Sequence, residues 1–346
     1  MKIGKIKQKF HNFDTLIKSF THGKWDYFTG AIDLLFCRFI HKISINEYLT
    51  YKLYNYKHRY RKNFLLQRHR TFFENVNARA FTRSKYTFYK YIPDLFAREL
   101  IIAPFCGEAA FVAFLKKHQK IVVKPDQGSL GKDIEVITYT DDETAKTYFS
   151  GITAERPFIC EEFIKQHPAL SQLNPASVNT IRICSLLVNG EVEILSAALK
   201  TGAGDDSITD NLSRGGIGAQ IDVESGIVCT FGKNFELKTF THHPTSGVPV
   251  LGLQIPHWQT AIDVIKEAHK RIPQCMFYGW DIAITETGVD IVEANSRPGI
   301  RNMQEIDGIP RGHKLIPLIK KDRLKEKRAA YEDEWRSNFR KYGLGQ

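Results

Sequence analysis

The sequence lacks the marks of a membrane-spanning, disulfide-bonded or zinc-ribbon protein. Its six cysteines are dispersed and none forms a CxxC pair, so neither a zinc ribbon nor a disulfide framework is supported. No run reaches the roughly 18 apolar residues that a spanning helix needs, because the longest candidate, residues 28–40, contains Asp33 and Arg38. The basic start lacks a following apolar segment with a cleavage site, so we expect no secretory signal. Scattered free thiols favour a reducing cytoplasm.

Two common phosphate-binding signatures are missing as well. Neither the GxxxxGK[ST] order of a P-loop nor the GxGxxG order of a Rossmann turn occurs, which excludes both classes of nucleotide-binding protein. His242 and His243 precede Pro244 in a turn-rich segment, and we expect them to be solvated loop residues rather than catalysts. The sequence shows no convincing Ser-His or Cys-His arrangement, so it does not indicate a protein nucleophile.

The chain does have a strongly uneven charge. The net charge of +11 lies entirely in residues 1–80, which hold 16 lysines and arginines against 5 acidic residues, whereas the remainder holds 33 of each. Aromatic and aliphatic residues recur in this segment at three- and four-residue spacings, which predicts amphipathic helices. Such a segment could lie on the anionic inner face of a membrane. A helical cap on the rest of the protein is the alternative, and we expect no nucleic acid partner.

Residues 279–299 predict a β-hairpin that brings acidic side chains together. Two apolar runs, residues 280–285 and 289–294, flank a short loop that ends in Gly288. Asn295 points to the same side as Glu293, because strand side chains alternate. With a three-residue loop, the expected cross-strand pairs are Thr285 with Val289, Ala283 with Ile291 and Asp281 with Glu293.

Asp281 and Glu293 would repel each other in this register, since directly opposed side chains have Cβ atoms roughly 4.5 to 5.5 Å apart. A cation between them reverses the sign of that interaction. Two carboxylates and the amide oxygen of Asn295 are hard ligands, which suit Mg²⁺ or Mn²⁺ better than zinc. The alternative is a solvated carboxylate pair on an exposed strand face.

Residues 121–137 predict two strands joined by a glycine-rich loop. Lys124 ends the first strand and supplies a fixed positive charge, while Gly128, Ser129 and Gly131 allow a loop whose backbone N–H groups point at an anion. This combination suits a polyphosphate. For the loop taken alone, a plain turn is the alternative.

A third element, residues 157–167, runs from a short apolar strand into an acidic and apolar linker. A phosphate lysine, a glycine-rich hairpin, this linker and a D…E-x-N hairpin, in that order, resemble the ATP-grasp superfamily. The resemblance implies an α+β fold in which two subdomains clasp Mg-ATP, with Lys124 on the phosphates and the glycine-rich loop as a lid. It also implies that backbone groups and one acidic side chain of the linker contact adenine. The linker residues concerned are Glu161, Glu162, Phe163 and Ile164.

Residues 170–187 and 211–228 narrow the resemblance to the sugar-transfer-associated ATP-grasp family, with a more distant similarity to the α-L-glutamate ligase type. The similarity covers residues 85–315. Arg182 and Arg214 occur in apolar or glycine-rich segments, where an unpaired guanidinium is costly and needs an anionic partner. A nearby carboxylate is the alternative partner. By resemblance, the residues that line the triphosphate or the acceptor are Arg182, Lys200, Asn211, Arg214 and Arg297.

Two departures from the family pattern stand out. Lys85 stands where the family has an earlier nucleotide-contacting lysine, although the aspartate that precedes it there is replaced by Ser84. Residues 1–80 also show no strand and glycine-turn pattern of the open α/β domain that most ATP-grasp ligases carry. Part of the acceptor pocket must therefore be built differently. After the linker, His167 or Gln166 could reach the ribose.

The expected organisation is a basic helical segment (1–80), two ATP-grasp subdomains (81–160 and 161–320) and a helical tail (321–346). We expect a cytoplasmic enzyme that uses Mg-ATP to activate a carboxylate as an acylphosphate. The acyl group then passes to an amine or a sugar hydroxyl, in surface polysaccharide biosynthesis as the family name implies. A sugar or polyol kinase of the same fold and a non-catalytic nucleotide-binding scaffold are the alternatives.

Overall fold

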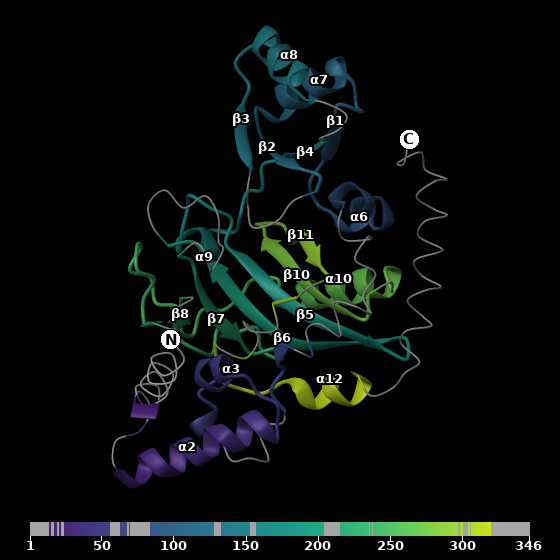
Figure 1. Ribbon diagram of the computed structural model, residues 1–346. Coiled ribbons are helices and arrows are strands. Elements are labelled where there is room, and N and C mark those ends of the chain that lie inside the picture. Colours follow the sequence, from purple (N-terminus) through teal and green to yellow (C-terminus); the bar gives the residue numbers. More distant parts are fainter. Residues whose placement is uncertain are drawn as a thin grey trace, which may run out of the picture. The chain divides into compact units, whose positions relative to one another are not determined.

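The computed structural model resolves two compact units, which we describe separately (Figure 1). The first comprises residues 1–69 and 308–320, and the second comprises residues 70–307 and 321–346. The residues that the structure describes are 14, 17–18, 21, 24–55, 63–67, 69, 84–127, 133–152, 157–203, 215–234, 236, 238–273, 275–296, 298–299, 304 and 306–319.

The first unit is helical in its described residues, as the spacing of apolar residues predicted. It contains α2 (Lys24–Phe39), α3 (Ile45–Thr50), the 3₁₀ helix η1 (Leu53–Asn55) and α12 (Gly312–Ile319). Ser44 and Glu47 start α3 with a reciprocal capping box, in which each accepts a hydrogen bond from the other's backbone N–H. The core of this unit gathers apolar side chains from α2, α3, η1 and the segment that follows η1: Leu34, Cys37, Tyr48, Leu53, Phe64 and Leu66.

The described helices do not include one that could cross a membrane, because none combines the required length with sufficient apolar content.

The second unit contains a small four-stranded antiparallel sheet with the order β1-β4-β2-β3. The strands are β1 (Leu100–Ala103), β2 (Lys120–Pro125), β3 (Glu135–Thr138) and β4 (Phe158–Glu162). These include the strands predicted at residues 121–123 and 134–137 and the apolar strand of 157–167, which are confirmed. Helices α7 (Glu108–His118) and α8 (Asp142–Ser150) lie side by side and share a core with the sheet (Figure 1).

Strand alternation divides the side chains of the small sheet between two faces. Val123 and Cys160 belong to the core shared with α7 and α8. Lys124 and Glu161, one position further along each strand, therefore project from the opposite face. The two residues are joined by an ion pair, with 2.8 Å between Nζ and Oε2. This face is the one that carries charge.

A seven-stranded antiparallel sheet forms the rest of the unit, in the order β11-β10-β5-β6-β7-β8-β9. Helix α10 (Trp258–Arg271) packs on β5 and β6, and α6 (Lys85–Tyr91), η2 (Pro93–Leu95) and α9 (Pro168–Ser171) complete the described elements. The strands are β5 (Thr180–Val188), β6 (Glu191–Thr201), β7 (Ile217–Ile221), β8 (Gly232–Lys233), β9 (Thr239–Phe240), β10 (Phe277–Ile284) and β11 (Val289–Asn295). With two antiparallel sheets and helices against them, the α+β class is confirmed.

The β10–β11 hairpin contains an irregularity that the sequence analysis did not anticipate. Asp281 pairs with Glu293 as expected, but the register shifts between Asp281 and Ile282. Beyond that point the expected pairs are wrong, because one extra residue of β11 is accommodated as a β-bulge. The observed pairs are Ile282 with Ile291, Ala283 with Asp290 and Ile284 with Val289.

The bulge changes which β11 side chains share a face. Ile291 and Ala294 both belong to the hydrophobic core although they are three positions apart, whereas strict alternation would put them on opposite faces. Val292, Glu293 and Asn295 line a pocket, which Ala294 also borders. A local shift in pairing therefore turns two consecutive side chains toward the same space.

The buried residues include one correction to the sequence analysis. His243 is buried rather than solvated, and its Nε2 lies 2.8 Å from the Gly202 carbonyl oxygen and 3.2 Å from Thr201 Oγ1. Burial lowers the pKa of His243. His242 is exposed, as expected. Cys160 and Cys184 are buried strand residues.

We expect the turn at Gly226 to tolerate no side chain. Gly226 has φ +74° and its added Cβ would lie 2.3 Å from Cγ of the buried Trp258. Gly226→Ala should therefore reduce the free energy of unfolding by about 2–5 kcal/mol, through left-handed strain and overpacking together. Urea unfolding followed by fluorescence measures this.

Gly247→Ala is the matched control for that substitution. Gly247 has φ +70° but no atom within 4 Å of an added Cβ, so only the backbone strain of about 1–2 kcal/mol is expected. Equal losses in the two variants would contradict the packing explanation.

Candidate functional site

A row of charged side chains crosses four strands of the large sheet on the face opposite α10. Arg182 on β5 pairs directly with Asp281 on β10, which pairs directly with Glu293 on β11. Lys200 on β6 joins the row, since its Nζ lies 3.3 Å from Asp281 Oδ2. Directly paired strand residues place their side chains on one face, so these two cations and two carboxylates are neighbours.

The centre of the row is the bidentate pair between Arg182 and Asp281. Arg182 Nε and Nη2 donate to Asp281 Oδ1 and Oδ2 at 2.6 and 2.7 Å. Burial alone would raise the pKa of Asp281, but the charges of Arg182 and then Lys200 outweigh it and hold that pKa far below its usual range. The alternative partner for Arg182, a nearby carboxylate, is thus confirmed.

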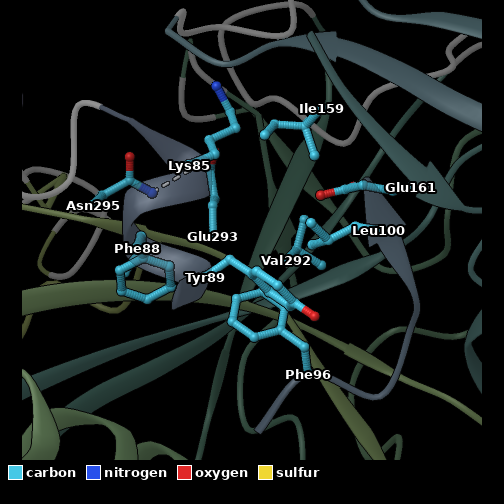
Figure 2. A pocket seen from close by; sticks show the side chains of 11 residues that line it. Lys85, Phe88, Tyr89, Phe96, Leu100, Ile159, Glu161, Val292, Glu293 and Asn295 are labelled. Atoms are coloured by element: carbon cyan, nitrogen blue, oxygen red, sulfur yellow. Dashed lines mark hydrogen bonds between the residues drawn. The ribbon is translucent and has the colours of Figure 1, made fainter. Parts of the chain in front are cut away.

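Glu293 and Asn295 form the other end of the row. Asn295 Nδ2 donates to Glu293 Oε1 at 2.9 Å, a bond drawn in Figure 2. Asp281 and Glu293 occupy directly paired positions of β10 and β11, so their carboxylates are neighbours on one face of the sheet. Two adjacent carboxylates and an amide oxygen on one sheet face are a donor set that fits a hard divalent cation.

A second charged cluster links the small sheet to β11 through Arg98, in the segment just before β1. Arg98 Nη2 donates to Glu161 Oε1 at 3.0 Å, and its Nη1 lies 2.7 Å from Asp290 Oδ1. It also donates to the backbone carbonyls of Ile291 and Val292. Each charged side chain of the cluster is less than one tenth exposed.

Glu161 shares its carboxylate between Arg98 and Lys124, one oxygen to each. Burial alone would raise the pKa of Glu161, but Arg98 and then Lys124 reverse the effect and lower it to about 2. Glu161 is therefore charged and fully paired. The cluster contains two cations and two carboxylates. Their mutual attraction offsets the free-energy cost of removing the four charges from water.

The sequence analysis missed Arg98 and Asp290. Arg98 stands in a short connection before a strand, where an arginine does not by itself indicate a buried site. Asp290 could have been found, because an acid inside the apolar run of β11 needs a buried partner.

Lys85, at the start of α6, lies beside the same cluster. Its Nζ donates to the carbonyl oxygens of Pro125 and Asp126 at 3.0 and 3.2 Å. Burial lowers its pKa, and the nearby charge of Lys124 lowers it further. Asp126 accepts hydrogen bonds from Ser84 Oγ and the Tyr86 backbone N–H, so the carboxylate that the sequence lacks before Lys85 is supplied by the end of β2.

These elements enclose a pocket with an apolar end and a polar end (Figure 2). Leu100 and Ile159 of the small sheet and Val292 of β11 form apolar walls, together with the rings of Phe88, Tyr89 and Phe96. Figure 2 shows the amine of Lys85 directed away from those rings. The polar lining consists of Lys85, Glu161, Glu293 and Asn295.

The linker after β4 distributes its side chains unevenly around this pocket. Glu162 projects away from it, accepting from the Glu99 backbone N–H at 3.2 Å. Phe163 packs under the amine of Lys120, 4.1 Å from the ring centroid, and Ile164 is half-buried. Among the linker acids, Glu161 alone faces the pocket.

Two residues suggested for the ribose already have internal partners. The side-chain amide of Gln166 donates to Asn174 and Ser177 and accepts from Asn179, so its hydrogen-bonding capacity is used within the fold. His167 caps α9, with Nδ1 accepting from the Ala169 N–H at 3.1 Å. Six other site residues lie outside the described part of the chain: Gly128, Ser129, Gly131, Asn211, Arg214 and Arg297.

The family comparison agrees with this architecture. A family model described as sugar-transfer associated ATP-grasp matches residues 107–318, which is more than half of the 346-residue chain. The chain belongs to the sugar-transfer associated ATP-grasp family. As a member, it has the ATP-grasp fold.

Solved structures with a similar fold are ATP-grasp ligases of low sequence identity. D-alanine–D-alanine ligase from Bacillus anthracis is 13% identical, with a TM-score of 0.43 over 72% of this chain and 69% of its own. The ATP-grasp ligase PsnB, complexed with its minimal precursor, Mg and ADP, is 12% identical, with a TM-score of 0.41 over 72% and 60%. This ATP-grasp chain thus spans less than two thirds of PsnB. A search of curated proteins returns no match.

We expect Arg98 to be essential for the stability of the ATP-grasp core. Arg98→Met leaves Asp290 without its buried guanidinium partner and Glu161 with Lys124 alone, so the free energy of unfolding should fall by about 3–5 kcal/mol. Urea unfolding with and without Mg-ATP measures the loss and its effect on nucleotide binding.

Arg271→Met provides the matched control. Arg271 makes a bidentate pair with Asp94 at 2.7 and 2.8 Å, but both partners are at the surface. Its removal should reduce the free energy of unfolding far less than removal of Arg98, because water screens an exposed ion pair. A similar loss in both variants would mean that burial does not set the strength of the Arg98 cluster.

Proposed function

We propose that this protein is a Mg-ATP-dependent ligase that activates a carboxylate as an acylphosphate and transfers the acyl group to an amine or hydroxyl acceptor. The supporting observation is a pocket in which apolar walls meet Lys85, two carboxylates and an amide oxygen, with Lys124 paired to one of those carboxylates. The carboxylate oxygen would attack the γ-phosphorus of ATP and ADP would leave. The acceptor nitrogen or oxygen would then displace phosphate and lose a proton.

For the nucleotide, we assign the apolar end of the pocket to adenine and the polar end to the phosphates. Leu100, Ile159 and Val292 offer an apolar slot between two sheets. Lys124 and Lys85 supply positive charge at its polar side. The lowered pKa of Lys85 reflects burial and the repulsion from Lys124, and an anion between the two lysines would relieve that repulsion.

Glu161 receives a positioning role in this proposal. Both of its carboxylate oxygens are held by cations, so its first effect is to fix Lys124 and connect it to Arg98. In this proposal, the backbone groups of Phe163 and Ile164 form the hydrogen bonds with the edge of the adenine base. Glu162, on the opposite side of the strand, takes no part.

We assign the divalent cation to Asp281, Glu293 and Asn295. A bound Mg²⁺ or Mn²⁺ would supply charge neutralisation on the phosphate oxygens. Arg182 and Lys200 stand next to these ligands, where they can hold the substrate carboxylate and stabilise a developing oxyanion. Arg214 and Arg297 are proposed for the same acidic substrates, and Asn211 for the nucleotide, on family resemblance.

The biological setting is proposed on the family description and on chemistry. Sugar-transfer association points to surface polysaccharide synthesis, with a sugar amine or hydroxyl as an acceptor. A cytoplasmic location would supply ATP and keep the six free cysteines reduced.

Removing Glu293 tests the cation site. Glu293→Ala should reduce turnover by about a hundredfold or more and raise the Mg²⁺ concentration needed for half-maximal ATP binding, because a charged ligand is lost. Isothermal titration of Mg-ATP at several Mg²⁺ concentrations, together with ADP release, measures both. Glu286→Ala, which removes an exposed carboxylate from the same hairpin, should change neither quantity. Unchanged titration and turnover in Glu293→Ala would refute the assignment.

The ligase reaction is tested by trapping the acylphosphate. Incubation with Mg-ATP, a panel of amino acids and sugar acids, and hydroxylamine should yield a hydroxamate in step with ADP, because hydroxylamine intercepts the mixed anhydride. A stable phosphorylated sugar with no hydroxamate from any carboxylate would establish a kinase instead. ATP binding without ADP release would indicate a scaffold.

A further inference from the structure

Helix α2 presents apolar side chains on two different faces. One face belongs to the core of the helical unit, through Leu34 and Cys37, with Tyr27 and Ala31 packed against that core. The other is exposed. Six large apolar side chains between residues 28 and 40 form this exposed set: Phe28, Ile32, Leu35, Phe36, Phe39 and Ile40.

The exposed side chains follow the periodicity of the helix. Phe28, Ile32, Leu35 and Phe39 recur at intervals of four, three and four residues, which aligns them in one stripe along α2. Phe28 is 57% exposed, Ile32 66% and Phe39 72%. The stripe is therefore a continuous apolar surface rather than scattered single residues.

Asp26, Asp33 and Arg38 of α2 lie off the stripe. Asp33 accepts a hydrogen bond from Tyr48 Oη at 2.5 Å, which ties it to the helical unit, and Asp26 and Arg38 are also at other positions around the helix. Two exposed lysines follow on, Lys42 just after α2 and Lys52 after α3. The surrounding sequence is strongly basic, since residues 1–80 carry the whole net charge of +11.

We propose that the α2 stripe docks on an anionic membrane surface, with the helix lying in the plane of the interface. Apolar side chains would enter the boundary between headgroups and acyl chains, while the basic residues of the segment contact acidic headgroups. From Phe28 to Phe39 the stripe extends about 16 Å along the helix. That length suits an in-plane helix and is too short to cross the hydrocarbon core.

The net positive charge and the exposed apolar stripe together favour an anionic membrane over other binding partners. A second copy of the chain carries the same net positive charge in residues 1–80, so like charges would oppose the contact. Nucleic acid would attract the charge but would gain nothing from a row of phenylalanine, isoleucine and leucine side chains. An anionic bilayer satisfies both features at once.

Vesicle co-sedimentation of the full chain tests the proposal. The wild type should sediment with vesicles of phosphatidylcholine and phosphatidylglycerol, less so at high salt, and not with phosphatidylcholine alone. The combined variant Ile32→Gln, Leu35→Gln and Phe39→Gln should bind more than about a hundredfold more weakly, because three large side chains lose their burial in the bilayer.

The matched control replaces three exposed apolar side chains of the other unit, Phe105→Gln, Val136→Gln and Leu251→Gln, and should bind vesicles like the wild type. Circular dichroism confirms that both variants keep their helices, and sedimentation equilibrium reports their oligomeric state. Three results would each overturn the proposal. The first is a wild type that does not bind anionic vesicles. The second is a stripe variant that binds them as well as the wild type does. The third is a wild type that is a dimer in solution and does not bind vesicles, together with a stripe variant that is a monomer.

Discussion

The buried guanidinium of Arg98 is the interaction on which the ATP-grasp core of this protein depends. It meets Glu161 of the small sheet and Asp290 of the large one, and through Glu161 it fixes Lys124. Removing any one member would leave an uncompensated charge away from water. The cluster therefore constrains the separation of the two sheets, and that separation sets the width of the pocket between Ile159 and Val292.

Strand pairing in the large sheet brings the charged residues of the site together. Its face against α10 is apolar, so charged residues can only line up on the other face. There Arg182, Asp281 and Glu293 occupy directly paired positions, and Lys200 closes the row. The two acids lie together toward β11 and the two bases toward β6. The row therefore favours an incoming cation beside the acids and an incoming anion beside the bases. Both are components of a metal–nucleotide complex.

Charge is distributed unevenly along the chain. Outside residues 1–80 the acidic and basic residues are equal in number, and Lys124 pairs with Glu161 as Arg182 does with Asp281. Residues 1–80 hold the entire excess of positive charge, and α2 adds an exposed apolar stripe. The excess of positive charge and the exposed apolar stripe therefore both lie in the N-terminal segment.

The sequence by itself determined the fold class, the strands around Lys124 and Glu161, and the pairing of Asp281 with Glu293, because periodicity and turn chemistry are local. It did not determine the register beyond the bulge, since an extra residue in β11 is accommodated by packing of Ile291 and Ala294 against a distant core. Nor did it place Arg98, Asp126 or His243, whose partners lie far along the chain. Which charge neutralises which was decided only by tertiary structure, because a buried ion pair is selected by distance in space and by the absence of water around it.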